Sequence, residues 1–143
     1  MLTALYNVLI ADSTLTGYLT GGIYMAQTVD SISRQNTPNA FDANGEILPC
    51  ALLKSESATP WGPHRDSARE YVLLYFYQRF GYAAIRPARQ RVYELTHRTK
   101  ITPVGTDKLW RIDWANDILD SGDQALGVAM IMSRYVATIE RNR

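Results

Sequence analysis

The sequence has few of the residues that most often carry out chemistry. Its 143 residues include one cysteine, Cys50, and two histidines, His64 and His97. A single cysteine excludes an intramolecular disulfide and a zinc site of the CxxC type. The histidines have neither HxxxH nor HExxH spacing, and no glycine belongs to a GxGxxG or GxxxxGK motif. We therefore expect no metal site, no phosphate-binding loop and no cofactor.

The sequence also has almost no excess of charge and no long apolar run. Fifteen Lys and Arg against fourteen Asp and Glu give a formal net charge of +1, whereas dedicated nucleic-acid-binding proteins usually carry a basic excess. The longest apolar runs, such as residues 71–77, are far shorter than the ~20 residues of a membrane-spanning helix. The first residues lack the basic region of a signal peptide, which predicts a protein that stays in the cytoplasm where it is made.

Hydrophobic residues nevertheless make up 46% of the sequence, a fraction that excludes wholesale disorder. The length fits one domain over residues 1–143 with its own core. Apolar residues three or four positions apart predict a helix at the start of the chain and another over residues 84–98. Alternating or β-branched and aromatic runs predict strands over residues 23–28, 47–57, 69–79, 109–119 and 127–140. This order predicts an α+β fold, a mostly antiparallel β-sheet with two helices packed against it.

A polar segment over residues 29–46 interrupts this pattern. Its eighteen residues show no clear period, and such a length is unusual for a connection inside a compact domain. We predict that the segment lacks a fold of its own and becomes ordered against a neighbouring protein, with Phe41 as its aromatic anchor. The alternative is a mobile surface loop without a function.

Several apolar side chains are predicted to lie on a sheet face that two short helices cannot cover. Val128 is one of these side chains. The others are our candidate interface residues, namely Tyr71, Leu73, Tyr75, Met130 and Met132. Trp61 is a further candidate, because the prolines on either side of Trp61-Gly62 stiffen its loop and an aromatic on a stiff loop loses little entropy on docking. Alternatively, the loop folds back and Trp61 fills the end of the sheet.

No arrangement of residues in the sequence indicates catalysis. Cys50 lies in an apolar strand and is predicted to be a buried, inert thiol. Asp113 and Asp117 would lie ~13 Å apart on the solvent face of a strand, too far for paired carboxylates. The only basic cluster is better explained as the solvated face of a helix than as a phosphate contact; its members are Arg86, Arg89, Arg91, Arg98 and Lys100. We expect a protein that is not an enzyme.

The order of these features resembles a known family. A helix ends in Leu9-Ile10-Ala11-Asp12, and a short turn with Leu15, then Gly21-Gly22 and a strand, come after it. After a variable loop come a strand that opens with Leu48-Pro49, the aromatic strand 71–77, the helix and two closing strands. In this the chain resembles siphophage tail terminators and related head–tail joining proteins. It departs from them in lacking an arginine before Ile23 and in the length of the segment 29–46.

The resemblance implies a structural role in the neck of a tailed phage. Such proteins form a homo-oligomeric ring, typically a hexamer, which caps the tail tube, stops its polymerisation and joins the tail to the head connector. The implied partners are further copies of the chain, the tail tube protein and a head-completion or connector protein, and no membrane is involved. DNA would pass through the lumen without sequence-specific binding, which suits a near-neutral chain. The implied location is the virion, after assembly in the host cytoplasm. The alternatives are a head-completion or stopper protein of the same neck, and a small cytosolic binding domain unrelated to viruses.

Overall fold

The computed structural model describes residues 2–61, 64–99, 101, 108–123 and 128–140, without the side chains of residues 61, 64–67, 108–110, 120–123 and 140. The described strands form one five-stranded sheet in the order β1-β2-β3-β5-β4, in which only the β1–β2 pair is parallel. The predicted α+β class with a mostly antiparallel sheet is confirmed. The elements in chain order are α1 (Leu2–Ala11), α2 (Ser13–Tyr18), β1 (Ile23–Met25), α3 (Ala26–Val29), the 3-10 helix η1 (Pro38–Ala40), β2 (Cys50–Trp61), β3 (His64–Gln78), α4 (Ile85–Thr96), β4 (Lys108–Asp123) and β5 (Val128–Glu140).

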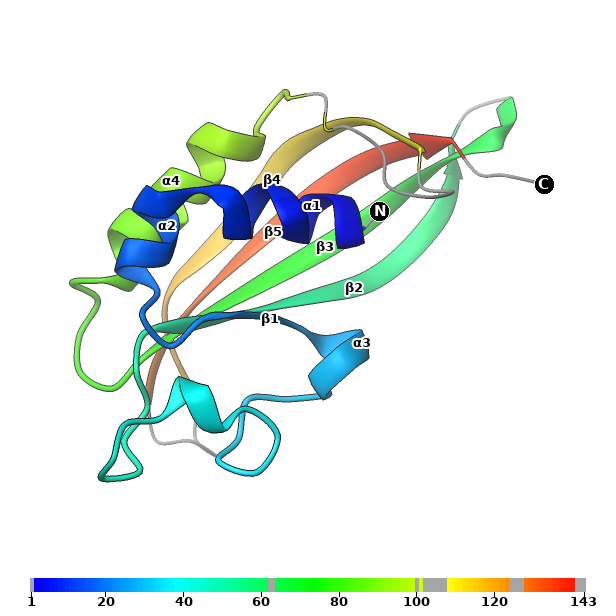
Figure 1. The fold of residues 1–143 in the computed structure, drawn as a ribbon. Helices are drawn as coiled ribbons and strands as arrows, with labels where there is room; N and C mark the ends of the chain where they lie inside the picture. Colours follow the sequence, from blue (N-terminus) through cyan, green and yellow to red (C-terminus); the bar gives the residue numbers. More distant parts are fainter. Residues whose placement is uncertain (1, 62–63, 100, 102–107, 124–127, 141–143) are drawn as a thin grey trace.

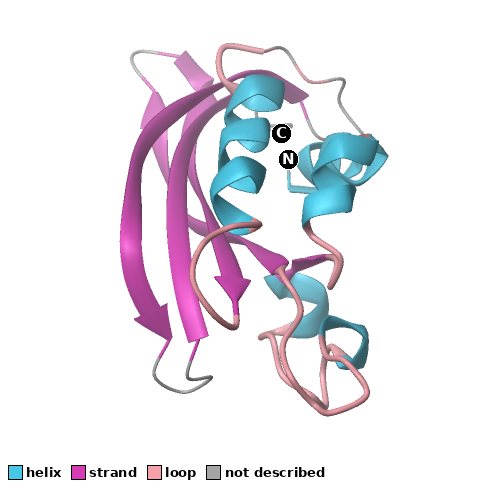
Figure 2. Ribbon diagram, turned by 90° about the vertical axis from the view of Figure 1, so that its left-hand side faces the viewer, coloured by secondary structure: helices cyan, strands magenta, loops and turns pink. Residues whose placement is uncertain are grey.

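Helices α1, α2 and α4 pack on one face of the sheet, which we call the helix face (Figure 1). Helix α1 contacts β1 and β2, while α4 contacts β3, β4 and β5. The sheet curves around these helices, as Figure 2 shows from the side. The main core lies between the two layers, because alternate strand residues and one stripe of each helix point into it. Its largest fully buried side chains include Leu5, Leu9, Val72, Leu74, Phe76, Ile85, Val92, Ile112, Ile131 and Tyr135.

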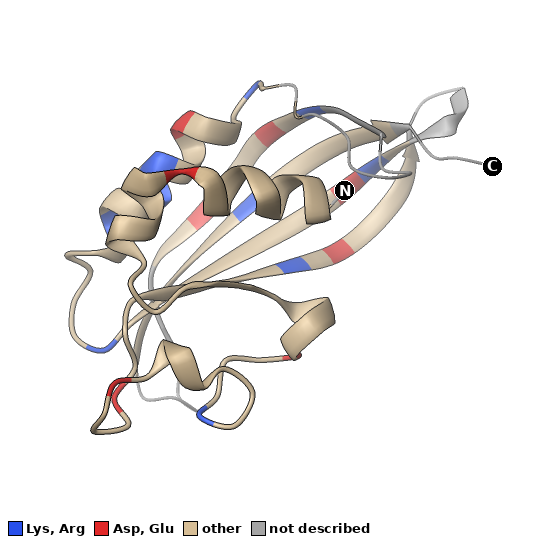
Figure 3. Ribbon diagram, in the orientation of Figure 1, with Lys and Arg blue, Asp and Glu red and all other residues tan. Residues whose placement is uncertain are grey.

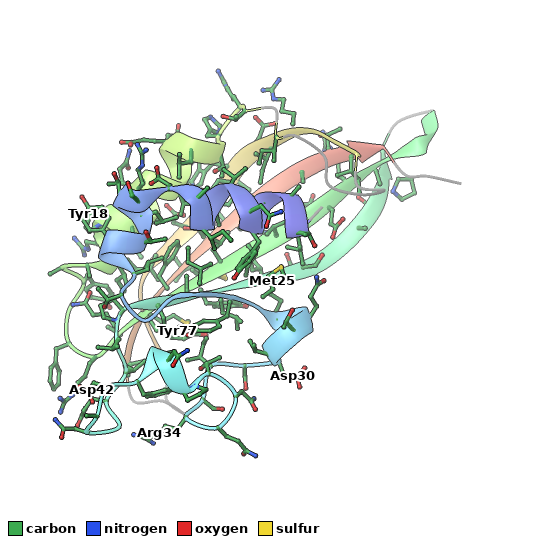
Figure 4. All side chains as sticks on the ribbon, viewed as in Figure 1. Tyr18, Met25, Asp30, Arg34, Asp42 and Tyr77 are labelled. Carbon is green, nitrogen blue, oxygen red and sulfur yellow. The ribbon has the colours of Figure 1, made fainter. Side chains whose placement is uncertain are left out.

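The polar segment after β1 folds back beneath the opposite face of the sheet (Figure 1). Ile32, Ala40 and Ile47 are buried there in a second, smaller core with Cys50 and Tyr77. Figure 4 shows Tyr77 between this segment and the strands, and Arg34 and Asp42 towards the outer side of the segment. The prediction that the segment lacks a fold of its own is therefore wrong. The sequence did not predict this fold, because turns separate the few buried residues of the segment and leave no helical or strand period.

Local hydrogen bonds hold this segment together. The buried Thr37 hydroxyl accepts from the Ser33 amide at 3.1 Å and donates to the Ser33 carbonyl at 3.0 Å. Asp42 Oδ1 accepts from the amides of Asn44 and Glu46, which closes a tight turn. The Arg34 Nε donates to the Gly45 carbonyl at 2.7 Å. These bonds provide partners for backbone polar groups of the segment that do not take part in the hydrogen bonding of a strand or helix.

Several element boundaries differ from those predicted. Residues 26–28 belong to α3 instead of continuing the first strand, and β4 continues through residue 123, beyond the end at residue 119 that the sequence predicted. Register shifts interrupt β4 between Leu109 and Arg111, Trp114 and Asn116, and Ile118 and Ser121. Each shift changes which side chains face the helices, because side chains in a strand alternate between faces. The sequence of residues 100–107, with Pro103 and Gly105, also predicts that the chain returns to the sheet there, but all of these residues except Ile101 lie outside the described part of the chain.

Candidate functional site

The predicted interface residues of β3 and β5 lie together on the face opposite the helices. Tyr75 pairs with Leu52 of β2 and with Met132 of β5, and Tyr77 pairs with Cys50 and Met130. The alternate residues of the same strands are buried on the helix face. The sequence pattern therefore placed Tyr71, Leu73, Tyr75, Met130 and Met132 on a common face, as the structure has them. Their role in an interface stays a prediction.

The folded segment covers part of this face. Phe41, Tyr75, Val128 and Met130 pack against the second core as partly buried side chains. Phe41 also lies beneath the Arg34 guanidinium, 5.4 Å from the ring centroid. Burial and, next, the negative charge of Glu56 raise the pKa of Tyr75. Less of the sheet is therefore free for docking than the sequence suggested, because the chain itself covers one end of the face.

An ion pair covers the middle of the face. The Arg134 Nε lies 3.1 Å from the Glu56 carboxylate, and the Arg134 guanidinium lies 4.4 Å from the centroid of the Tyr71 ring. Leu73, which pairs with Arg134 across the strands, is buried, with 8% of its surface exposed. Leu73 is consequently a packed residue in the single chain, while Tyr71 and Met132 are half-buried and remain at the surface.

Trp61 is the last residue of β2, and its backbone pairs with His64 across the β2–β3 turn. The side chains of both residues lie outside the described part of the chain. The prediction that Trp61 is an interface anchor is therefore neither confirmed nor contradicted. The backbone pairing does place Trp61 at the end of the β2–β3 pair.

Cys50 and His97, two reactive residue types with described side chains, both have surroundings typical of a structural role. Cys50 is fully buried, and burial raises the pKa of its thiol to about 12, so it is a protonated, unreactive group at neutral pH. The His97 Nδ1 accepts a hydrogen bond from the Trp114 amide at 2.9 Å, and its ring stacks on Tyr93. Within the described residues, no three His, Cys, Asp or Glu side chains gather as a group that could hold a metal ion.

The basic cluster of α4 is only partly a solvated face. The Arg89 Nη1 lies 2.7 Å from Asp117 Oδ2, and 6% of the Asp117 side chain is exposed. The sequence predicted that Asp117 lies on the solvent face of its strand, and this is wrong. The register shift after Trp114 turns Asp117 towards α4, where it pairs with Ser133 across the strands. Arg91 likewise pairs with Asp12, so these two arginines fasten α4 to its neighbours.

Sequence reasoning missed the most exposed apolar residues. The large hydrophobic side chains that are exposed in the described part of the chain are Ile10, Tyr18, Phe80, Trp114, Ile118 and Leu119. Phe80 is 73% exposed. Its position beside Gly81, just after a strand of aromatic residues, is the one sequence signal that it stands on a turn. Trp114, Ile118 and Leu119 all belong to the edge strand β4. The register shifts in β4 change which face each side chain points to, so the sequence pattern did not predict their exposure.

Among the described residues, no helix combines the length and the apolar character that crossing a membrane requires. Neither a family model nor a curated protein matches the sequence.

A solved structure does share the fold. It is described as the virion of a native gene transfer agent (GTA) particle, and one of its chains superposes on this protein with a TM-score of 0.66. The superposition covers 98% of this chain and 94% of that chain, and the two sequences are 12% identical. At this identity the match concerns the fold. The shared fold extends over nearly the full length of both chains.

Proposed function

We propose that this protein is a structural subunit of a phage-like virion and has no enzymatic activity. The observation that carries the proposal is the shared fold with a chain of a GTA virion particle over nearly the full length of both chains. Fold alone does not imply function, so the surroundings of the reactive side chains matter as well. A buried Cys50 with a raised pKa and a His97 that accepts a backbone hydrogen bond offer no activated nucleophile or base, which supports a structural role.

Within the virion, we propose a place in the neck. The protein forms a ring, typically a hexamer, that caps the tail tube and joins the tail to the head connector. This finer assignment rests on the resemblance of the sequence to tail terminators, from the Leu9–Asp12 helix end through Gly21-Gly22 to the aromatic strand. Its partners are further copies of itself, the tail tube protein and a head-completion or connector protein. The ring is assembled in the host cytoplasm, and DNA passes through its lumen.

The near-neutral charge suits such a conduit. A ring multiplies every phosphate contact by the number of its subunits, so a basic lumen would hold DNA tightly. With fifteen basic and fourteen acidic residues, the chain avoids this. In addition, the pairing of Arg89 with Asp117 and of Arg91 with Asp12 neutralises two of the arginines on α4.

The test is the assembly state of the purified protein and what it binds. Light scattering and negative-stain images should show a ring with a central hole, and the ring should bind the ends of purified tail tubes and stop their growth. A species of only 16.1 kDa at high protein concentration contradicts the proposal. Rings that bind filled heads but not tubes identify a stopper protein of the same neck instead of a terminator.

A further inference from the structure

A small group of polar side chains is buried between α4 and the sheet. Arg89 on α4 and Asp117 on β4 form an ion pair there, with 2.7 Å between Nη1 and Oδ2. Figure 3 shows basic residues on α4 and acidic residues on β4, the two elements that this pair joins. Ser133 and Tyr135 of β5 lie on the same face, with 0% and 1% of their surfaces exposed. We call these four residues the polar cluster. Their neighbour Ile131 is buried and apolar, so polar groups here need partners that replace bulk water.

Hydrogen bonds within the chain serve only part of the polar cluster. Both oxygens of Asp117 have donors, since Oδ2 accepts from the Arg89 Nη1 and Oδ1 accepts from the Trp114 Nε1 at 3.0 Å. By contrast, the Arg89 Nε, the Ser133 Oγ and the Tyr135 hydroxyl are buried and find no hydrogen-bond partner among the described residues. Native proteins leave few buried polar atoms unpaired, because such an atom has given up water without a replacement. Three in one cluster therefore indicate a shared partner from outside the chain.

The three atoms belong to residues around the same ion pair. The strand register sets Ser133 opposite Asp117, the carboxylate that Arg89 contacts. Ser133 and Tyr135 are two positions apart on β5, so their side chains share the face towards α4, with Cα atoms about 7 Å apart. Burial raises the pKa of the Tyr135 hydroxyl, and the neighbouring Thr96 hydroxyl opposes the rise without making a hydrogen bond of ordinary geometry to it. The charge of Asp117 adds to the rise and that of Arg89 opposes it, so both charges lie within electrostatic range of this hydroxyl.

The chemistry of the three atoms selects the partner. The Arg89 Nε can only donate, whereas each of the two hydroxyls can donate or accept. The bound group must therefore accept from the guanidinium and also offer hydrogens or lone pairs to the hydroxyls, as a water molecule does. The charge of Arg89 disfavours a cation at this place, and the Asp117 carboxylate beside it disfavours an anion. Buried waters typically make about three hydrogen bonds to groups that are otherwise unpaired.

We propose that the polar cluster binds one internal water molecule, which accepts a hydrogen bond from the Arg89 Nε and is hydrogen-bonded to the hydroxyls of Ser133 and Tyr135. The water joins α4 to β5, as the Arg89–Asp117 pair joins α4 to β4. It also fixes the guanidinium that holds Asp117, and Asp117 in turn accepts from the indole of Trp114. Because Trp114 is 40% exposed, the buried water helps to hold an aromatic side chain at the surface of the edge strand. The site does not depend on whether the protein forms a ring.

A crystal structure of the full chain, at a resolution that shows ordered water, tests the site directly. The expected result is one density peak within hydrogen-bond distance of the Arg89 Nε, the Ser133 Oγ and the Tyr135 hydroxyl. Soaking a crystal in bromide distinguishes an anion, because bromide gives an anomalous signal and water does not. Any other arrangement overturns the proposal, whether a bromide peak, a cluster without density or three atoms that bond only to protein groups.

Substitution of the two hydroxyls gives a test in solution. Ser133→Ala and Tyr135→Phe each remove one bond to the water, so each should lower the folding equilibrium constant by roughly 5-fold. Because both hydroxyls act through one water, the double variant should lose less than the product of the two single losses. Urea denaturation measures these changes, and circular dichroism shows that each variant is folded.

Tyr18→Phe is the matched control. Tyr18 on α2 is 38% exposed and lies outside the polar cluster, so removal of its hydroxyl should change the folding equilibrium constant by less than about 2-fold. If the buried hydroxyls of Ser133 and Tyr135 had no partner, their removal would leave the protein as stable as the wild type or more stable. That result overturns the proposed water site and leaves the proposed virion role untouched.

Discussion

The Arg91 guanidinium donates two hydrogen bonds to the Asp12 carboxylate, from Nε to Oδ2 at 2.9 Å and from Nη2 to Oδ1 at 2.8 Å. Asp12 is also the N-cap of α2, since its Oδ2 accepts from the Leu15 amide at 2.9 Å. A single carboxylate thus caps one helix and fastens α4, 79 residues further along the chain, to the corner between α1 and α2.

The two roles of Asp12 can be separated by substitution. Asp12→Asn keeps an oxygen that can cap α2 but removes the charge, whereas Asp12→Ala removes both. We expect Asp12→Ala to lower the free energy of unfolding by about 1 kcal/mol more than Asp12→Asn does, because that is the ordinary worth of an N-cap. Urea denaturation of the two variants measures the difference. Equal losses would show that the cap contributes nothing.

The ion pair should make stability depend on pH. The hydrogen bonds from Arg91 hold the pKa of Asp12 below its usual 3.8, although burial opposes them. A carboxyl whose pKa is lowered in the folded state contributes its stability fully above its unfolded pKa and loses it as the pH falls through its folded pKa. The stability difference between wild type and Asp12→Asn should therefore be constant near neutral pH and shrink below about pH 4. Denaturation curves from pH 7 to pH 2 check this. A stability difference between the two proteins that stays constant over this range contradicts the prediction.

Cys50 should be chemically silent until the chain unfolds. Its pKa of about 12 leaves almost no thiolate at pH 8, and its complete burial blocks access. A thiol reagent such as Ellman's reagent should label the native protein very slowly and the urea-unfolded protein at once. Fast labelling under native conditions would mean that the second core opens readily.

The second core should be a real source of stability. Ile32 is 5% exposed beneath the sheet, so Ile32→Ala should lower the free energy of unfolding by about 2 kcal/mol, at the low end for a buried isoleucine because the core is small. Ile10→Ala on the surface of α1 is the control and should change it by less than about 0.5 kcal/mol. Hydrogen exchange should show faster exchange over residues 31–47 in Ile32→Ala than in the wild type. Equal exchange rates would return the segment to the mobile loop that the sequence suggested.

Trp61 remains a predicted interface anchor at the end of the β2–β3 hairpin. As an anchor, Trp61→Ala should leave the thermal stability of the subunit nearly unchanged while it weakens ring assembly or attachment to the tail. As a residue that fills the end of the sheet, it should cost about 3–5 kcal/mol. Thermal melting together with light scattering distinguishes the two, and a poorly folded variant would rule out the anchor.

The sequence predicted features whose cause is local. Ile85, Ala88 and Val92 recur at helical spacing and are buried in α4. The short acidic side chain of Asp12 is of a type that caps helices, and Asp12 is the N-cap of α2. The fold class followed from the order of such elements. The predicted interface face was also sound as a set of positions, because alternation along β3 is undisturbed between Tyr71 and Tyr77.

The remaining features depend on contacts between distant residues. Ile32, Ala40 and Ile47 have no common period, and they are buried only because Cys50 and Tyr77 present an apolar surface to them. The direction of Asp117 and Ile118 depends on register shifts that form when β4 pairs with β5, so alternation in the sequence alone assigns Asp117 to the wrong face. The sequence by itself thus determined the two longer helices and most strands, since spacing and residue type act within a few residues. Only the tertiary structure decided which surfaces stay exposed, because burial is shared between segments that the chain brings together when it folds.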